Sequence, residues 1–119
     1  MGRTSDKTTR FLPLSPQDFH VLLVLKDEPR HGYGIVRAAE EQFTGNLGLD
    51  IGTLYRIVAR LLEHGLVREL DPKDLPQIDG RKRRFYQATK LGVQVARAEA
   101  IRLRVLLSTR PAAELLESE

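Results

Sequence analysis

The sequence contains no cysteine, no tryptophan and no long apolar run. Without cysteine, the chain can form neither disulfide bonds nor thiolate metal sites. Its longest apolar run, residues 21–25, is far too short to cross a bilayer, and the polar N-terminal stretch does not resemble a secretion signal. We therefore expect a cytoplasmic protein that does not associate with membranes. A chain of 119 residues provides for one core and leaves no room for a second, catalytic domain.

Residue groupings typical of enzymes are also missing from the sequence. We find no nucleophile beside a base, no glycine-rich phosphate loop and no convergent pair of carboxylates. The three histidines, His20, His31 and His64, are scattered and lack the spacing of metal ligands. We therefore expect no metal, no cofactor and no enzymatic activity, and we look for a binding function instead.

Positive charge is modest in total but clustered along the chain. The net charge is +3, and cations concentrate in residues 3–10, 81–84 and 97–104, whereas the last residues are acidic. A single run of charge is usually only a solvated surface. The run at 81–84 means more because it lies at the expected tip of a hairpin that follows an amphipathic helix.

Helix signals predict three short helices between residues 11 and 65. Ser15 is a favourable N-cap with Pro16 after it, and we expect this first helix to end near residues 27–29. The second helix is expected to begin at residues 31–32 and to end at residues 44–46. Gly65 ends the third helix, whose apolar residues recur at three- and four-residue spacing. This apolar face consists of Leu54, Ile57, Val58, Leu61 and Leu62.

A β-hairpin is predicted directly after the third helix. Residues 66–70 suit a strand, residues 71–80 contain the prolines and glycine of an exposed loop, and residues 84–88 suit the return strand. Three helices followed by such a hairpin form a winged helix-turn-helix, so the expected fold is mainly α with a small β-hairpin. We expect Tyr33 and Phe85 to complete its core.

Thr89 can cap a last helix that spans residues 90–108. The apolar positions of this helix form a heptad-like face, which we predict to be a dimer interface. The predicted interface residues are Leu91, Val95, Ala98, Ile101 and Val105. The alternative is a helix that folds back on the core of a monomer. The domain organisation is then a flexible basic arm (1–10), a winged helix-turn-helix domain (11–89), a C-terminal dimerisation helix (90–108) and an acidic tail (109–119).

Polar residues of the third helix and the hairpin form the predicted DNA-binding surface. Thr53 and Tyr55 lie in the first helical turn, where hydroxyls and backbone amides can hold a phosphate. Arg56 and Arg60 point outward along one line and can bind guanine edges. The hairpin contributes Arg81, Lys82 and Arg83. Two alternatives stay open, namely a half-buried Tyr55 that only packs and an Arg60 that pairs with Glu63.

Three groups of residues resemble the PadR-like family of transcriptional regulators. The first is His31, Gly32 and Tyr33 at the start of the second helix. The second is on and after the third helix: Gly52, Thr53, Leu54, Tyr55, Arg60, Leu61, Gly65, Leu66 and Val67. The third spans the predicted hairpin, which is the wing of the fold, and the start of the last helix: Gly80, Arg81, Tyr86, Thr89 and Gly92.

The resemblance implies a homodimeric repressor whose last helices form the dimer and whose third helices enter successive major grooves of double-stranded DNA. It also implies a small-molecule effector, whose identity the sequence does not give. Two residues depart from the family pattern: Arg56 replaces a common proline, and Gly34 replaces a frequent acidic residue. The operator of a relative therefore does not transfer to this chain.

The expected function is that of a sequence-specific DNA-binding transcriptional regulator, a repressor that binds a pseudo-palindromic operator. The alternative is a winged-helix module that binds other proteins and has lost DNA binding. In that case, neutralising the cations of the third helix and the wing would have no effect. The retained cationic clusters favour the DNA-binding hypothesis.

Overall fold

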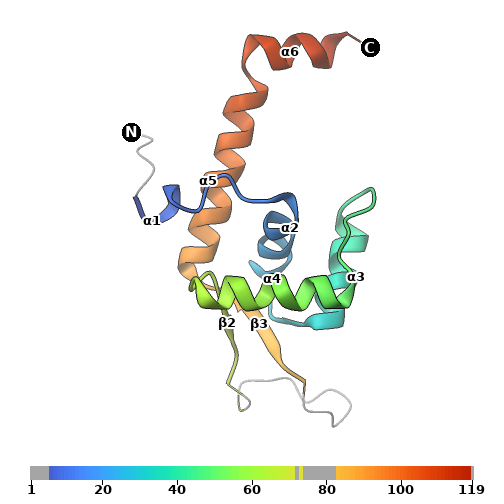
Figure 1. Ribbon diagram of the computed structural model, residues 1–119, viewed down its shortest axis with the longest axis vertical. Coiled ribbons are helices and arrows are strands. Elements are labelled where there is room, and N and C mark those ends of the chain that lie inside the picture. The colour runs from blue at the N-terminus through green and yellow to red at the C-terminus, as the bar shows by residue number, and fades with distance from the viewer. Residues whose placement is uncertain (1–5, 72, 74–82, 119) are drawn as a thin grey trace.

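The chain folds into a helical body with a small antiparallel sheet, and a long helix leads away from that body (Figure 1). The computed structural model describes residues 6–71, 73 and 83–118. In chain order the elements are α1 (Asp6–Thr9), α2 (Pro16–Leu25), β1 (Arg30–His31), α3 (Gly32–Gln42), α4 (Ile51–Glu63), β2 (Val67–Glu69), β3 (Phe85–Ala88), α5 (Lys90–Leu107) and α6 (Arg110–Glu117). This arrangement is a winged helix-turn-helix, so the predicted fold class, mainly α with a small β-hairpin, is confirmed.

Side-chain caps fix where four of the helices begin. The Ser15 hydroxyl accepts a hydrogen bond from the Asp18 amide at the start of α2, and the Thr89 hydroxyl accepts one from the Gly92 amide at the start of α5. Both caps follow the predictions. The other two capping residues are His31 for α3 and Asp50 for α4. Each cap satisfies an amide that the helix itself leaves without a partner.

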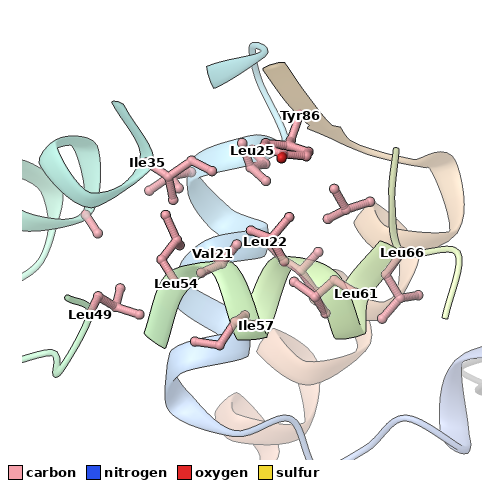
Figure 2. Packing of buried hydrophobic residues seen from close by; sticks show 14 of the residues in the cluster. Val21, Leu22, Leu25, Ile35, Leu49, Leu54, Ile57, Leu61, Leu66 and Tyr86 are labelled. Carbon is pink, nitrogen blue, oxygen red and sulfur yellow. The ribbon is translucent and has the colours of Figure 1, made fainter. Parts of the chain in front are cut away.

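The core lies where α2, α3 and α4 meet. Figure 2 shows side chains from all three helices in contact there, among them Leu25, Ile35 and Leu54. The predicted apolar face of α4 is confirmed, although Leu62 is only half-buried. In α2, Val21, Leu22 and Leu25 are fully buried. Each fully buried leucine stabilises the fold by roughly 2 kcal/mol.

The sheet has one more strand than predicted. Its order is β1-β3-β2, and β3 is antiparallel to both neighbours. The hairpin strands β2 and β3 lie within the predicted ranges. Strand β1 pairs Arg30 with Tyr86 and His31 with Phe85. A strand of two residues is too short to show alternation in the sequence, and for that reason it was missed.

A glycine sets how closely α5 approaches the end of α4. A Cβ atom at Gly92 would lie 2.0 Å from the Leu66 carbonyl oxygen, so only glycine fits there. Gly65 has a φ of 73° and ends α4 as predicted. The Thr89 hydroxyl donates a 2.7 Å hydrogen bond to the Gly65 carbonyl. The start of α5 is therefore fixed against the winged-helix body.

Both ends of the chain contain helices that were not predicted. Helix α1 lies inside the stretch expected to be a flexible arm, yet it packs against α5 and its Thr8 is buried. Helix α6 lies inside the expected acidic tail, where Arg110 pairs with Glu114. Short helices of this kind depend on packing or single ion pairs more than on sequence periodicity, which hid them from prediction.

The predicted dimer face of α5 divides into two parts. Val95 is fully buried in the core of its own chain, and Leu91 packs against that core. Val95 is therefore unavailable to a second subunit, and its assignment to the dimer interface is wrong. Ile101 and Val105 are exposed, beyond the part of α5 that packs on the body. The fold-back alternative thus holds for the inner half of α5.

Candidate nucleic-acid interface

The exposed face of α4 lies opposite its buried face and contains three of the predicted DNA-binding residues, Tyr55, Arg56 and Arg60. The Arg56 guanidinium donates a 3.2 Å hydrogen bond to the Thr53 hydroxyl, so these two side chains lie together near the start of α4. Asp50 accepts a 2.8 Å hydrogen bond from the Thr53 amide. That amide and the Thr53 hydroxyl hold the pKa of the Asp50 carboxyl below its usual value, so the cap stays charged.

Arg60 contacts a different helix. Its guanidinium forms an ion pair with Asp18 of α2, so the alternative in which it pairs with Glu63 is wrong. The Arg60 side chain is exposed, whereas the Asp18 carboxylate is largely buried. Because its guanidinium is engaged with α2, Arg60 holds α2 and α4 together at this edge of the predicted surface.

Two tyrosines, Tyr33 and Tyr55, lie at the start of α3. Tyr55 lies on the surface, and a Cβ atom at Gly32 would lie 2.6 Å from its hydroxyl oxygen. Tyr55 therefore covers the first turn of α3. Tyr33 is 63% exposed, so the prediction that it completes the core is wrong, whereas Phe85 is buried as predicted.

Helical geometry explains the position of Tyr33. In α3 the buried residues are Gly32, Ile35, Ala38 and Ala39. Tyr33 and Arg37 are four residues apart and lie on the opposite side of the helix. The same spacing is visible in the sequence and could have identified Tyr33 as a surface residue.

The wing is described only in part. Arg81 and Lys82, which were predicted to contact DNA, lie outside the described residues. Arg83 is half-buried, and its Nη1 atom is 3.0 Å from Nε2 of His31. It was predicted at the hairpin tip, but the structure places it at the base, against the start of α3. The His31 ring also contacts Phe85 edge-on, with centroids 5.4 Å apart.

The surroundings of His31 are positively charged. Burial, together with the nearby Arg83 and Arg37, lowers the pKa of the His31 imidazole. His31 is therefore neutral at neutral pH. Residues from α3, α4 and the base of the wing thus meet around the His31–Gly32 junction, through the Arg83 contact on one side and Tyr55 on the other. This junction and the exposed first turn of α4 form one candidate surface for an anionic partner.

Within the described residues, no three His, Asp or Glu side chains gather in a way that could hold a metal ion. None of the helices in the described part of the chain has the length and apolarity needed to cross a membrane.

Comparisons with known proteins agree with the expectation of a transcriptional regulator. The model of the transcriptional regulator PadR-like family matches residues 21–98. A PadR family transcription regulator from Clostridium difficile is 21% identical, with a TM-score of 0.65 over 77% of this chain and 91% of that one. A PadR-like transcriptional regulator from Bacillus cereus is 17% identical, with a TM-score of 0.68 over 97% of this chain and 100% of that one. A third, from Eggerthella lenta, is 26% identical, with a TM-score of 0.62 over 93% of this chain and 92% of that one. No curated protein matches the chain.

Proposed function

Because the chain belongs to the PadR-like family of transcriptional regulators, we propose that it is a sequence-specific DNA-binding repressor that acts as a homodimer. The observation that carries this proposal is the exposed face of α4, which presents Tyr55 and Arg56 on the side away from the core. The family consists of transcriptional regulators, and membership in it confirms the expectation of a transcriptional regulator.

In the proposed complex, α4 enters the major groove of DNA. Thr53 at its first turn and Tyr55 just beyond that turn contact the phosphate backbone near the positive end of the helix dipole, which favours an anion. Arg56 binds a guanine edge and contributes roughly 1 to 3 kcal/mol of discrimination between bases. Arg60 contributes less to base contacts than predicted because Asp18 engages it. Arg81, Lys82 and Arg83 contact the flanking backbone or minor groove.

Dimerisation through the outer half of α5 completes the proposal. Ile101, Val105, Leu106 and Leu107 are exposed there, and Leu115 and Leu116 are exposed on α6. An apolar surface of this kind favours association with a second copy. A dimer related by a two-fold axis would bind a pseudo-palindromic operator, with half-sites about 10 base pairs apart. The protein would act in the cytoplasm, and any small-molecule effector is unidentified.

The alternative function is a protein-binding winged helix without DNA binding. The two functions differ in what the exposed cations do. If α4 and the wing bind DNA, removing Arg56 weakens binding and relaxes base preference, whereas a protein-binding module would not respond to DNA at all.

The test is a fluorescence anisotropy titration with labelled DNA from upstream of the protein's own gene and a shuffled duplex, at two salt concentrations. We expect the parent protein to prefer the upstream DNA, with an affinity that falls steeply as salt rises. Arg56→Ala should lose roughly 1 to 3 kcal/mol of that preference. Arg97→Ala, at an exposed arginine of α5 outside the proposed surface, is the matched control and should bind like the parent.

A light-scattering measurement of mass belongs to the same experiment. Preferential binding by a dimer would support the proposal. Failure to bind either duplex at low salt would contradict it and favour the protein-binding module. Equal affinity for both duplexes would contradict the assignment of this upstream DNA as the operator.

A further inference from the structure

The two ring nitrogens of His31 face different groups. Nδ1 is 3.2 Å from the Gly34 amide and accepts its hydrogen bond as the N-cap of α3. Nε2 is 3.0 Å from Nη1 of Arg83. Because His31 is in β1 and Arg83 lies two residues before the paired strand β3, the sheet itself holds these two side chains together.

Both nitrogens at the His31–Arg83 contact carry hydrogen atoms, so neither can accept a hydrogen bond from the other. A backbone amide can only donate, so Nδ1 of His31 carries no proton. A neutral imidazole then carries its proton on Nε2. An arginine guanidinium has only donors, so Nε2–H and the Arg83 N–H groups point donor against donor at 3.0 Å. This contact cannot be a hydrogen bond, and both groups lack an acceptor there.

Positive charge surrounds this pair. The charged groups that act on His31 are Arg83, from the segment before β3, and Arg37 of α3. The side chain that packs on the ring from β3 is Phe85, which is uncharged. In the part of the chain that the structure describes, no carboxylate forms an ion pair with Arg83, and the nearby Glu69 pairs with Arg84 instead. An anion with acceptor oxygens would satisfy both donors and balance the charge.

We propose that Nε2–H of His31 and the guanidinium of Arg83 bind one phosphate of the DNA backbone together. The ligand follows from the chemistry, because a phosphate presents several acceptor oxygens to donors that lie side by side. Such a contact fixes the base of the wing and the start of α3 on the same phosphate. It rests on the proposed DNA-binding function and adds His31 to the binding residues, where the sequence indicated only a helix-end residue.

His31→Asn separates the cap of α3 from the phosphate contact. Asparagine is a good N-cap, so it can keep the hydrogen bond to the Gly34 amide, but it is too short to replace Nε2–H. The titration uses a short duplex of random sequence at low salt, because a backbone contact does not depend on sequence. It is done at about pH 8, where histidine is neutral.

We expect His31→Asn to bind about tenfold more weakly than the parent, with the same dependence on salt, because a neutral donor releases no counterion. Arg83→Gln should also bind more weakly, and its salt slope should fall by about one. The double variant should lose less than the product of the two single losses, since both side chains hold one phosphate. His64→Asn, at the C-terminal end of α4 and away from the His31–Arg83 pair, is the control and should bind like the parent.

The outcomes separate this inference from the proposed function. If the parent binds the duplex and His31→Asn binds equally well, the shared phosphate is wrong and the DNA-binding function stands. Fully independent losses in the double variant would contradict a shared phosphate as well. If the parent does not bind the duplex, both proposals fail.

Nitrogen NMR of the histidine rings in the free parent protein gives a measurement that needs no variant to fold. We expect the His31 proton on Nε2, and a shift of that nitrogen when the duplex is added. A proton on Nδ1 would overturn the inference, because the contact with Arg83 would then be an ordinary hydrogen bond.

Discussion

The two halves of α5 are both rich in apolar residues, yet they have different surroundings. In the inner half, Val95 and Ala96 are buried against the body of the same chain. In the outer half, Val105, Leu106 and Leu107 are exposed where the helix leads away from that body (Figure 1). An apolar pattern on a helix therefore shows that a face is suited to burial, but not which surface covers it.

Gly92→Ala tests the inner half and should have the largest effect on stability. The added methyl would lie 2.0 Å from the Leu66 carbonyl oxygen, so α5 would have to move away from the body. We expect a loss of about 3 kcal/mol or more, measured by urea denaturation. Gly52→Ala is the matched control in α4, where the nearest atom is 3.5 Å away. It should be neutral or stabilising by up to about 1 kcal/mol, and an equal loss in both variants would contradict the explanation.

Val105→Glu tests the outer half. The side chain is 61% exposed in the single chain, so the fold should tolerate the change, with stability within about 0.5 kcal/mol of the parent. At a dimer interface, however, the charge would be buried without a partner, and self-association should weaken by more than about tenfold. Analytical ultracentrifugation measures this directly. A variant that stays dimeric at the same concentration as the parent would place the interface elsewhere.

Arg102→Met tests the boundary between the halves. Glu99 is 2% exposed, and its carboxylate accepts hydrogen bonds from the Arg102 guanidinium at 2.7 and 2.8 Å. Methionine keeps much of the packing of arginine but leaves the carboxylate without its main partner. We expect thermal denaturation to show a loss of about 1 to 2 kcal/mol, because Arg102 is itself partly exposed. Pairing the change with Glu99→Gln should recover part of that loss, and no recovery would contradict the role of the ion pair.

The pH dependence of stability should show a smaller contribution from the same pair. Hydrogen bonds from Arg102, and a weaker one from the Leu14 amide, hold the pKa of Glu99 below its ordinary value of 4.5, against the opposing effect of burial. A lowered carboxyl pKa stabilises the fold above that ordinary value, and the contribution is lost as pH falls through the folded-state pKa. Acid denaturation of the parent should include this loss, and Glu99→Gln should lack it. Identical acid profiles would refute the contribution.

Local patterns predicted much of the fold. Ser15, Gly65 and Thr89 marked helix ends correctly, because a cap or a left-handed residue acts within a few positions of itself. The spacing of apolar residues identified the buried face of α4 for the same reason. The two-residue strand β1 was missed, since it exists only through pairing with β3.

The candidate site was predicted less completely. The cations of α4 and the wing were visible in the sequence, but their partners were not. Arg60 pairs with Asp18, which is 42 positions away, and His31 contacts Arg83, which is 52 positions away. The exposed Tyr33 is different, because the helical spacing of α3 could have revealed it.

The sequence by itself determined where the main helices and the hairpin form, which faces are apolar and where positive charge gathers. These properties depend on neighbours within one or two helical turns. The tertiary structure decided which half of α5 the chain covers with its own core, which carboxylate engages Arg60 and which side chain faces His31. Each of these depends on contacts between segments far apart in the chain, and such contacts are fixed only when the whole core packs.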